Sequence, residues 1–196
     1  MKRLLSGYAR ETLLIVDGTH IRSVDGSEGL GYGYKEHGKK ALKITAVADT
    51  NKIIRITGIC PDNLSDNTAF LQLARAHPSQ TPVDVLADAG YVGKEFKEEA
   101  FNLGYRVISP QKRFKFGASS PPTPYETLLL KRHRPKVVHI FGRLKRFKSI
   151  QVKSVKTLAT FNTFLAIAVL IVNLHNGVIR KGLKRRVPIR LTPYML

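Results

Sequence analysis

Cysteine and tryptophan are almost missing from this chain of 196 residues, which contains one cysteine, Cys60, and no tryptophan. A single cysteine excludes a disulfide framework and a zinc site built from several cysteines, and it suits a reducing compartment. We therefore interpret Cys60 as a small core residue that follows a strand. A secretory signal is also missing, because Arg10 and Glu11 interrupt the short apolar stretches near the N-terminus. These features predict a cytoplasmic protein.

Acidic residues are scarce in the second half of the chain. Residues 1–99 hold 13 lysines and arginines against 13 aspartates and glutamates, whereas residues 100–196 hold 20 against Glu126 alone. The second half therefore accounts for the whole formal charge of +19. Clustered Lys and Arg side chains neutralise phosphates, so this asymmetry favours a polyanionic partner, nucleic acid before membrane. A basic tail that only keeps the chain soluble is the alternative.

Long hydrophobic runs are missing as well, with one exception at residues 158–174. This run is marginal in length for a membrane span, and Asn162, Thr163 and Asn173 interrupt it. We interpret it as a buried helix that packs on a sheet. With 43% hydrophobic residues, the chain has enough apolar side chains for a globular domain. We expect this domain to span residues 1–175, followed by a basic tail over residues 176–196.

Two aspartates stand at the carboxyl ends of short apolar runs. Asp17 ends the run TLLIVD and Asp88 ends the run VDVLAD, and each run is typical of a buried strand. Carboxylate oxygens are the ligands that Mg²⁺ prefers in proteins. Two carboxylates on neighbouring strand ends therefore indicate the start of a metal site.

The remaining pattern predicts an alternation of strands and helices. ALKITAVAD and NKIIRITGI are two arms with β-branched residues around a turn at residues 49–52, which is typical of a hairpin. Capping residues and apolar residues at helical spacing predict a helix over residues 66–76. A strand, a helix closed by Gly104 and a further strand are expected up to residue 109.

Residues 110–127 are basic and then proline-rich, without sustained periodicity, so we expect a loop or linker inside the domain. A helix is expected to begin at Arg134 and Pro135, because proline is tolerated in the first helical turn. Its apolar residues recur at spacings of three and four and form one stripe. The stripe consists of Val137, Ile140, Phe141, Leu144 and Phe147.

Three motifs carry a family resemblance: DGTHIR around Asp17, VLADAGYVG around Asp88 and RPKVVHIFGRLKRF from Arg134. In this order they resemble the motifs of bacterial insertion-sequence DDE transposases of the insertion-sequence-four and -five group. The resemblance covers roughly residues 12–175. It implies an α/β, RNase H-like fold, a mixed sheet flanked by helices, and DNA strand cleavage and transfer with Mg²⁺ or Mn²⁺. It also implies that Asp17 and Asp88 are catalytic, metal-binding aspartates.

The third motif lacks its acidic residue, because Val138 occupies the position of the family's catalytic Glu. At about 100° per residue, Arg134, Gly142 and Lys145 lie within roughly 40° of Val138, and the apolar stripe is centred roughly 120° away. We therefore expect Val138 on a basic face of the helix. The alternative is that Val138 packs against the flank of the sheet. The missing Glu predicts impaired catalysis and a weakly held or lost metal ion.

Other side chains were weighed as replacement ligands. Glu126 could reach a metal only if the linker folded over the site. Asp49 is expected to stabilise the hairpin turn, and Asp66 is expected to be a helix N-cap. His139, next to Val138, points about 100° away from it on a helix, so we expect it on the surface or in a partner contact.

Charge and resemblance together predict DNA as the partner, and the terminal repeats of an element are the expected DNA sequence. We expect the chain to associate with the nucleoid when it binds DNA, and a homodimer is a further expected assembly. No membrane and no small-molecule substrate are expected. Nine basic residues are expected to line the DNA: Lys112, Arg113, Lys131, Arg132, Arg134, Arg143, Lys145, Arg146 and Lys148. A second basic cluster consists of Lys181, Lys184, Arg185 and Arg186.

Relatives commonly carry a helical DNA-binding region before the first aspartate, and here 16 residues precede Asp17. We expect either the second reading frame of a two-frame element or a truncated remnant. A non-catalytic protein that binds element DNA or inhibits an active transposase is the alternative of a different class. A resolvase-like or RNA–DNA hybrid nuclease is a third hypothesis, which the ADAGY and FGRLK motifs disfavour.

Overall fold

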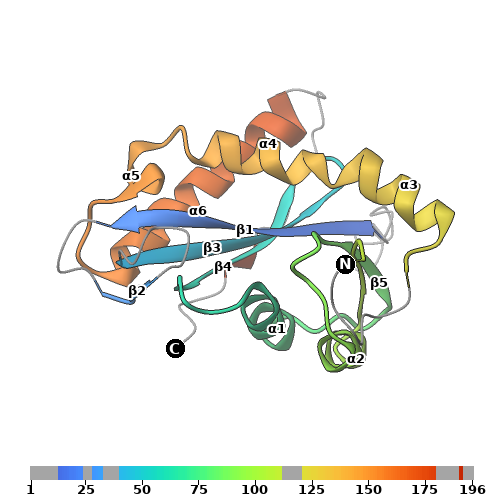
Figure 1. Cartoon of the computed structure of the whole chain (residues 1–196). Helices are drawn as coiled ribbons and strands as arrows, with labels where there is room; N and C mark the ends of the chain where they lie inside the picture. The colour runs from blue at the N-terminus through green and yellow to red at the C-terminus, as the bar shows by residue number, and fades with distance from the viewer. Residues whose placement is uncertain (1–12, 24–27, 33–39, 112–120, 180–189, 192–196) are drawn as a thin grey trace.

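The computed structural model describes residues 13–23, 28–32, 40–111, 121–179 and 190–191. These residues form a mixed β-sheet with helices on both faces (Figure 1). The strand order is β6-β5-β1-β3-β4-β8, and the short strands β2 and β7 pair with β3 and β1. The strands are β1 Leu13–Ser23, β2 Gly31–Tyr32, β3 Lys40–Asp49, β4 Ile54–Pro61, β5 Val83–Leu86, β6 Tyr105–Ile108, β7 Val152–Lys153 and β8 Arg190–Leu191.

The sheet combines an antiparallel half with a parallel half. Strands β1, β3 and β4 pair antiparallel, and β3 and β4 form the hairpin that the sequence predicts. Strands β5 and β6 run parallel to β1, joined by helices that cross over one face. The expected fold class, a mixed sheet flanked by helices, is confirmed.

Strand β1 is longer than its apolar run. The sequence places Asp17 at the end of a strand, but β1 continues to Ser23, and Asp17 lies in the middle of it, opposite Ala46 of β3. That expectation is wrong because strand pairing uses backbone N–H and C=O groups, so polar residues continue a strand as well as apolar ones. Strand β5 pairs with β1 only up to Ile15. Asp17 therefore lies beyond the last paired residues of β1 and β5.

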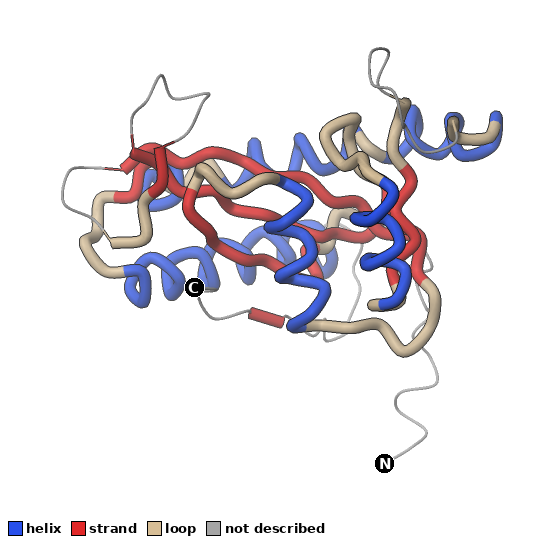
Figure 2. Tube along the Cα trace, turned by 60° about the horizontal axis from the view of Figure 1, so that its bottom comes forward, coloured by secondary structure: helices blue, strands red, loops and turns tan. Residues whose placement is uncertain are grey.

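The described residues form six α-helices. Their bounds are α1 Asp66–Ala76, α2 Lys94–Asn102, α3 Pro124–His133, α4 Pro135–Leu144, α5 Lys148–Gln151 and α6 Leu158–Leu174, and α6 continues into a π-helical segment, η3 His175–Ile179. Helices α1 and α2 lie on one face, and α4 and α6 lie on the other (Figures 1 and 2). The first half of the chain thus supplies the helices of one face, and the basic second half supplies those of the other.

Helix α1 has the bounds that the sequence predicts. Helix α1 spans residues 66–76, but Ser65 is its N-cap, since the Ser65 hydroxyl accepts the N–H of Thr68 at 3.1 Å. The prediction that Asp66 is the N-cap is therefore wrong. Helix α2 is closed by Gly104, whose φ of +87° favours glycine. A Cβ atom at this position would lie 2.2 Å from the backbone oxygen of Ser79.

The expected linker over residues 110–127 contains the start of a helix. Helix α3 begins at Pro124, with Thr123 as its N-cap. The Thr123 hydroxyl accepts the N–H of Glu126, and the Glu126 carboxylate accepts the N–H of Thr123 at 2.9 Å, which makes a capping box. Pro124 lies in the first helical turn, where proline is tolerated, so the proline-rich sequence is compatible with a helix start. Residues 112–120, with Lys112 and Arg113, lie outside the described residues.

The sheet separates two hydrophobic cores. Alternate residues of β1 face opposite sides, so Ile15 and Ile21 join the core beneath α4 and α6, whereas Val16 joins the core beneath α1 and α2. The predicted stripe of α4 is confirmed, with four residues buried and Phe147 partly buried. Cys60 is buried, as expected, and burial raises the pKa of its thiol to about 11.

Helix α6 packs on the sheet through one side and exposes the other. Phe161, Leu165 and Val169 are buried in the core beneath α4, as predicted for this run. By length and composition, α6 with the following turn is also a candidate membrane span. Its opposite side exposes five large apolar residues: Phe164, Ile167, Leu170, Ile171 and Leu174.

The domain boundary expected at residue 175 does not coincide with an end of packing. Asn176 in η3 is buried, and its side-chain amide donates to the backbone oxygen of Lys52 at 2.8 Å. Strand β8 pairs in parallel with β4. Two segments of the expected basic tail therefore join the folded domain, whereas the cluster at residues 181–186 lies outside the described residues.

Candidate active site

Asp17 and Asp88 meet next to one another in the parallel half of the sheet. Asp88 follows the end of β5, and Asp17 lies on the adjacent strand β1 beyond the last β1–β5 pair. The Asp17 side chain accepts the N–H of Gly18 at 2.8 Å, and Asp88 accepts the N–H of Gly90 at 2.6 Å. The side chains are 19% and 36% exposed, so both carboxylates are open to solvent on one side. The expected pair is brought together.

The environment of Asp17 opposes its negative charge. Burial is the largest cause that raises the pKa of this carboxyl above its ordinary value of 3.8, and the charges of Asp88 and Asp66 act in the same direction. The N–H of Gly18 and the guanidinium of Arg134 lower the pKa, but by less than burial and the neighbouring carboxylates raise it. Asp17 is therefore a carboxylate that a cation would stabilise.

Asp17→Asn is expected to raise the melting temperature at pH 7. The pKa of Asp17 is higher in the folded state than in the unfolded state, so the folded state binds this proton more tightly. This contribution to stability is fully present below pH 3.8 and is lost as the pH rises through the folded-state pKa. At pH 7 the wild type therefore carries a charge that the fold disfavours, and the substitution removes it. The gain should disappear near pH 3, where Asp17 is protonated in both states. Thermal unfolding of both proteins at the two pH values measures this, and a lower melting temperature for Asp17→Asn at pH 7 would contradict it.

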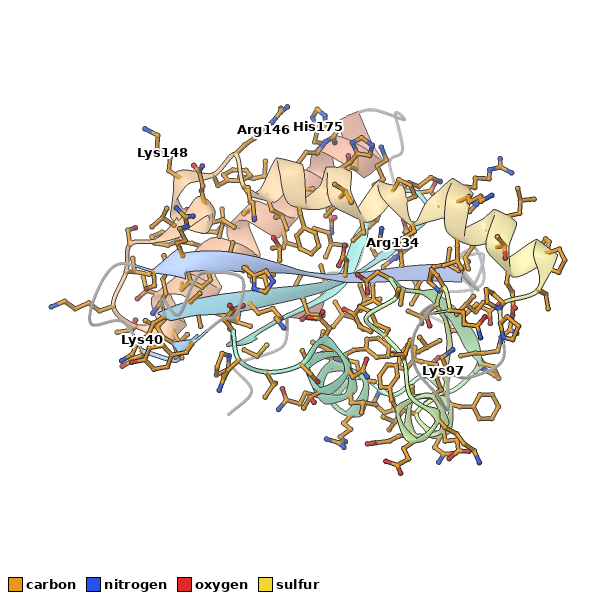
Figure 3. All side chains as sticks on the ribbon, viewed as in Figure 1. Lys40, Lys97, Arg134, Arg146, Lys148 and His175 are labelled. Carbon is orange, nitrogen blue, oxygen red and sulfur yellow. The ribbon has the colours of Figure 1, made fainter. Side chains whose placement is uncertain are left out.

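Arg134 links the third motif to the two aspartates. Its guanidinium Nη2 atom lies 3.5 Å from Asp88 Oδ2 and 4.0 Å from Asp17 Oδ2. Its side chain points from the junction of α3 and α4 toward the sheet (Figure 3). The Nε atom is buried and has no hydrogen-bond partner among the described residues. Arg134 therefore places a fixed positive charge beside the carboxylate pair.

Val138 lies one helical turn after Arg134 on α4. Its side chain is 56% exposed, so it does not pack in the core, whereas Val137 and Ile140 on either side are fully buried. A Cβ atom at Gly142, one turn further on, would meet no atom within 4 Å. The helix face predicted for Val138 is therefore open to solvent, and the alternative that Val138 packs against the sheet is not supported. His139 is also exposed, as expected.

The residues present fit a divalent cation such as Mg²⁺ with oxygen ligands. Asp17 and Asp88 would hold the ion, and Gly90 leaves room beside them, because a Cβ atom there would lie 2.8 Å from Asp88 Oδ1. Among the described residues, no three His, Cys, Asp or Glu side chains are grouped closely enough to hold one ion. Mg²⁺ keeps several waters and often binds one or two protein carboxylates. When bound, such an ion activates a nucleophile and stabilises the leaving oxygen of a phosphodiester.

Glu126 and Asp49, two of the other carboxylates weighed from the sequence, have other roles. Glu126 Oε1 accepts from Arg106 at 3.0 Å, and Oε2 accepts from Thr123 at the start of α3. Asp49 is fully buried and accepts from the N–H of Asn51 and from Arg55 at the hairpin, which confirms the hairpin interpretation. Neither carboxylate is available to the site.

Asp66 lies near the site, a position that the sequence did not indicate. A Cβ atom at Gly90 would lie 3.7 Å from Asp66 Oδ2, and the Asp66 charge contributes to the raised pKa of Asp17. The residue matched the pattern of a helix N-cap, so sequence reasoning assigned it a local role. Its long-range position depends on how α1 packs against the sheet, and no local signal reveals that.

The expected DNA-binding residues spread along the outer surface of α3, α4 and α5. Lys131 and Arg132 are exposed on α3, and Arg146 and Lys148 project away from the sheet (Figure 3). Arg143 donates to the side chain of Asn176, at a hollow of about 220 Å³ between α4 and α6. Lys145 is half-buried. Only Arg134 of the described members reaches the two aspartates.

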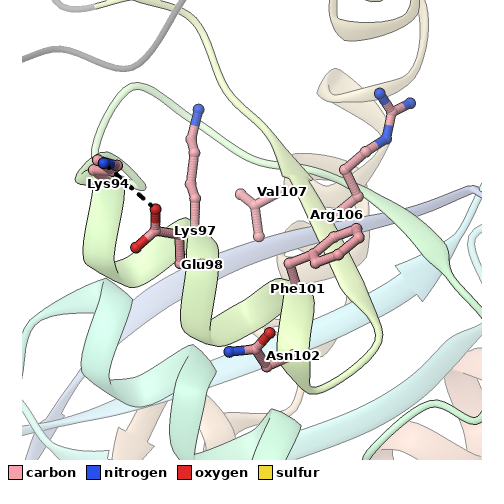
Figure 4. Close-up of a pocket in the computed structure, with 7 residues that line it drawn as sticks. All are labelled: Lys94, Lys97, Glu98, Phe101, Asn102, Arg106 and Val107. Carbon is pink, nitrogen blue, oxygen red and sulfur yellow. Dashed lines mark ion pairs between the residues drawn. The ribbon is translucent and has the colours of Figure 1, made fainter.

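A second hollow of about 340 Å³ lies on α2 and β6 (Figure 4). Lys94 and Glu98 form an ion pair of 3.7 Å at its rim, and Arg106 is paired with Asp84. None of the predicted site residues lines it. Its lining residues are Lys94, Lys97, Glu98, Phe101, Asn102, Arg106 and Val107.

Solved structures share the fold of this chain at low sequence identity. A simian T-cell lymphotropic virus intasome in complex with PP2A regulatory subunit B56 gamma matches with a TM-score of 0.51 and 15% identity, over 92% of this chain and 57% of that one. The piggyBac transposase synaptic complex with hairpin DNA matches with a TM-score of 0.49 and 12% identity, over 90% and 49%. The catalytic domain of Mos1 mariner transposase matches with a TM-score of 0.43 and 13% identity, over 89% and 85%.

The sheet order and the match to the intasome give an RNase H-like fold, as the resemblance implies. The chain spans about half the length of the first two structures that it matches. No curated protein matches the sequence. The family model described as "Transposase DDE domain" matches residues 8–174, which include Asp17, Asp88 and the whole of α4. The chain therefore belongs to the transposase DDE domain family.

Proposed function

We propose that this chain is the catalytic domain of a bacterial insertion-sequence transposase and that its strand-cleavage activity is impaired. The observation that carries the proposal is the group formed by Asp17, Asp88 and Arg134, with exposed Val138 one helical turn beyond Arg134. The family supplies the reaction class, and the residues supply two of three acidic ligands. Without a carboxylate at position 138, a metal ion would be held weakly and its charge misplaced, which weakens stabilisation of the transition state.

We propose that DNA lies across the outer surface of α3, α4 and α5. These helices carry exposed Lys131, Arg132, Arg146 and Lys148, and the described part of this surface has Glu126 as its one acidic residue. The opposite face of the sheet is covered by α2, which is rich in glutamate. A phosphate backbone would therefore approach from the α4 side, where Arg134 leads to the aspartates.

Lys131→Ala with Arg132→Ala is expected to weaken DNA binding and to make it less salt-dependent. If both side chains contact phosphates, the slope of log affinity against log salt concentration should fall by about two. A titration of DNA by fluorescence anisotropy at several salt concentrations measures this slope. Lys40→Ala with Lys94→Ala is the matched control, because both residues are exposed lysines from the first half of the chain. Equal changes in the two variants would place the DNA elsewhere.

The proposed enzyme lineage is tested by metal dependence. Mn²⁺ should bind to the wild type, and Asp17→Ala and Asp88→Ala should abolish its binding and any residual nicking of supercoiled DNA. Vigorous cleavage by the wild type that Asp17→Ala abolishes would refute the impairment. If the DNA affinity is the same in the wild type and in both variants, and if Mn²⁺ does not change it, the alternative of a non-catalytic DNA-binding remnant or inhibitor is favoured.

A further inference from the structure

Asp66 is a third carboxylate beside Asp88, and it approaches from the face opposite to α4. It is the first residue of α1, which covers that opposite face. A Cβ atom at Gly90 would lie 2.8 Å from Asp88 Oδ1 and 3.7 Å from Asp66 Oδ2. The two carboxylates therefore flank the same glycine, and the missing side chain leaves the space between them open.

Lys43 holds one oxygen of Asp66 and leaves the other available. The Lys43 ammonium donates to Asp66 Oδ1 at 2.8 Å and to the backbone oxygen of Leu64 at 2.6 Å. Lys43 is only 4% exposed, so its position is restricted by packing. No hydrogen bond from another described residue reaches Asp66 Oδ2. The oxygen that faces Gly90 and Asp88 is thus available to a ligand.

The phenol of Tyr91 is an independent sign that the space holds a ligand. Tyr91 is fully buried, and its hydroxyl has no hydrogen-bond partner among the described residues. Burial first, and then the charges of Asp66, Asp17 and Asp88, raise the pKa of Tyr91 well above its usual value. The charges of all three carboxylates therefore act on this hydroxyl, which stays a neutral donor. A buried donor without an acceptor is costly and is expected where a bound group or its water completes the site.

We propose that Asp66 is a positioning residue for the divalent ion: Asp66 Oδ2 accepts a hydrogen bond from a water of the ion's hydration shell, while Asp17 and Asp88 hold the ion. This inference rests on the proposed function of the aspartate pair. Asp66 acts through water, because no three acidic side chains in the described residues are close enough to share an ion directly. Residues that orient a metal's ligands typically change its affinity by about 10-fold to 100-fold.

The test measures Mn²⁺ affinity of the whole chain by isothermal titration calorimetry. Asp66→Asn should weaken binding by about 10-fold to 100-fold. Lys43→Met should strengthen it severalfold, because it removes a positive charge next to Asp66. Both substitutions break the same ion pair, so a purely structural role would move both variants in the same direction. Asp84→Asn, an aspartate on β5 paired with Arg106, is the matched control and should bind as the wild type does.

Circular dichroism checks the folding of each variant. If Asp66→Asn alone does not fold, the double variant Lys43→Met with Asp66→Asn takes its place, because it removes both charges of the ion pair. This double variant should bind Mn²⁺ as weakly as Asp66→Asn. Wild-type affinity in it, or in Asp66→Asn, while Asp17→Asn abolishes binding, would overturn the role of Asp66 and leave the proposed function intact. No Mn²⁺ binding by the wild type, or binding unaffected by Asp17→Asn, would overturn both.

Discussion

Val138→Glu is expected to increase Mg²⁺-dependent nicking of supercoiled DNA by about 100-fold to 1,000-fold over the wild type, the usual effect of one group that stabilises charge in a transition state. The substitution supplies the carboxylate that the resemblance to insertion-sequence transposases implies at this position of the third motif. Position 138 lies one turn from Arg134, which is 3.5 Å from Asp88, so a glutamate there would face the site from α4. Gel analysis of nicked and linear products gives the rate.

The substitution should be tolerated by the fold, because Val138 is 56% exposed and glutamate is a good helix former. His139→Glu is the matched control, since it adds the same charge to the neighbouring exposed position, about 100° away around the helix. Val138→Gln introduces a side chain of nearly the same shape as glutamate but without its charge, so it tests whether the charge is needed. Equal activity of Val138→Glu and His139→Glu would show that the added charge acts generally and not as a ligand. Inactivity of all three would mean that the impairment has a further cause.

Asp49→Ala is expected to destabilise the domain by about 3–5 kcal/mol, because it removes four hydrogen bonds to a buried carboxylate, and each contributes about 1 kcal/mol. Asp49 is fully buried at the end of β3. Its Oδ1 accepts the N–H of Asn51 at 2.8 Å and of Ile53 at 3.0 Å, and its Oδ2 accepts two N–H groups of Arg55. One carboxylate therefore holds the β3–β4 turn and the arginine, and alanine removes all four of these hydrogen bonds. Urea denaturation measures the loss of stability.

Two further substitutions serve as comparisons for the stability loss of Asp49→Ala. Asp49→Asn keeps an oxygen for the turn but removes the charge, so it should cost less than Asp49→Ala. Asp84→Ala removes an aspartate that pairs with Arg106 in an exposed position, and it should cost at most about 1 kcal/mol. A loss for Asp49→Ala as small as that for Asp84→Ala would show that the hairpin does not depend on this carboxylate.

The local elements were largely predictable because their signals lie within a few residues. Helix α1 has the predicted bounds, since capping residues and helical spacing are local properties. The start of α3 was missed although its capping box is present in the sequence, because three prolines nearby favoured a loop. The end of β1 was misplaced because its polar second half pairs through backbone groups, which side-chain pattern does not report.

The candidate site was predictable in part. Asp17 and Asp88 were found because each ends an apolar run, whereas Arg134 and Val138 were singled out through the third motif of the family resemblance. Asp66 was assigned a helix cap, and Tyr91 was not singled out. Both belong to the site only through the packing of α1 and of the loop after β5, which brings distant residues together.

By itself, the sequence determined the family of this chain, the valine at position 138 and the accumulation of positive charge in the second half. These properties depend on residue identity, order and local spacing. Only the tertiary structure decided that Arg134 lies beside both aspartates, that the basic helices share one face of the sheet, and that Asp66 reaches Asp88 from the other. The physical reason is that such contacts join residues far apart in the chain, and they exist only when the sheet pairs and both cores pack.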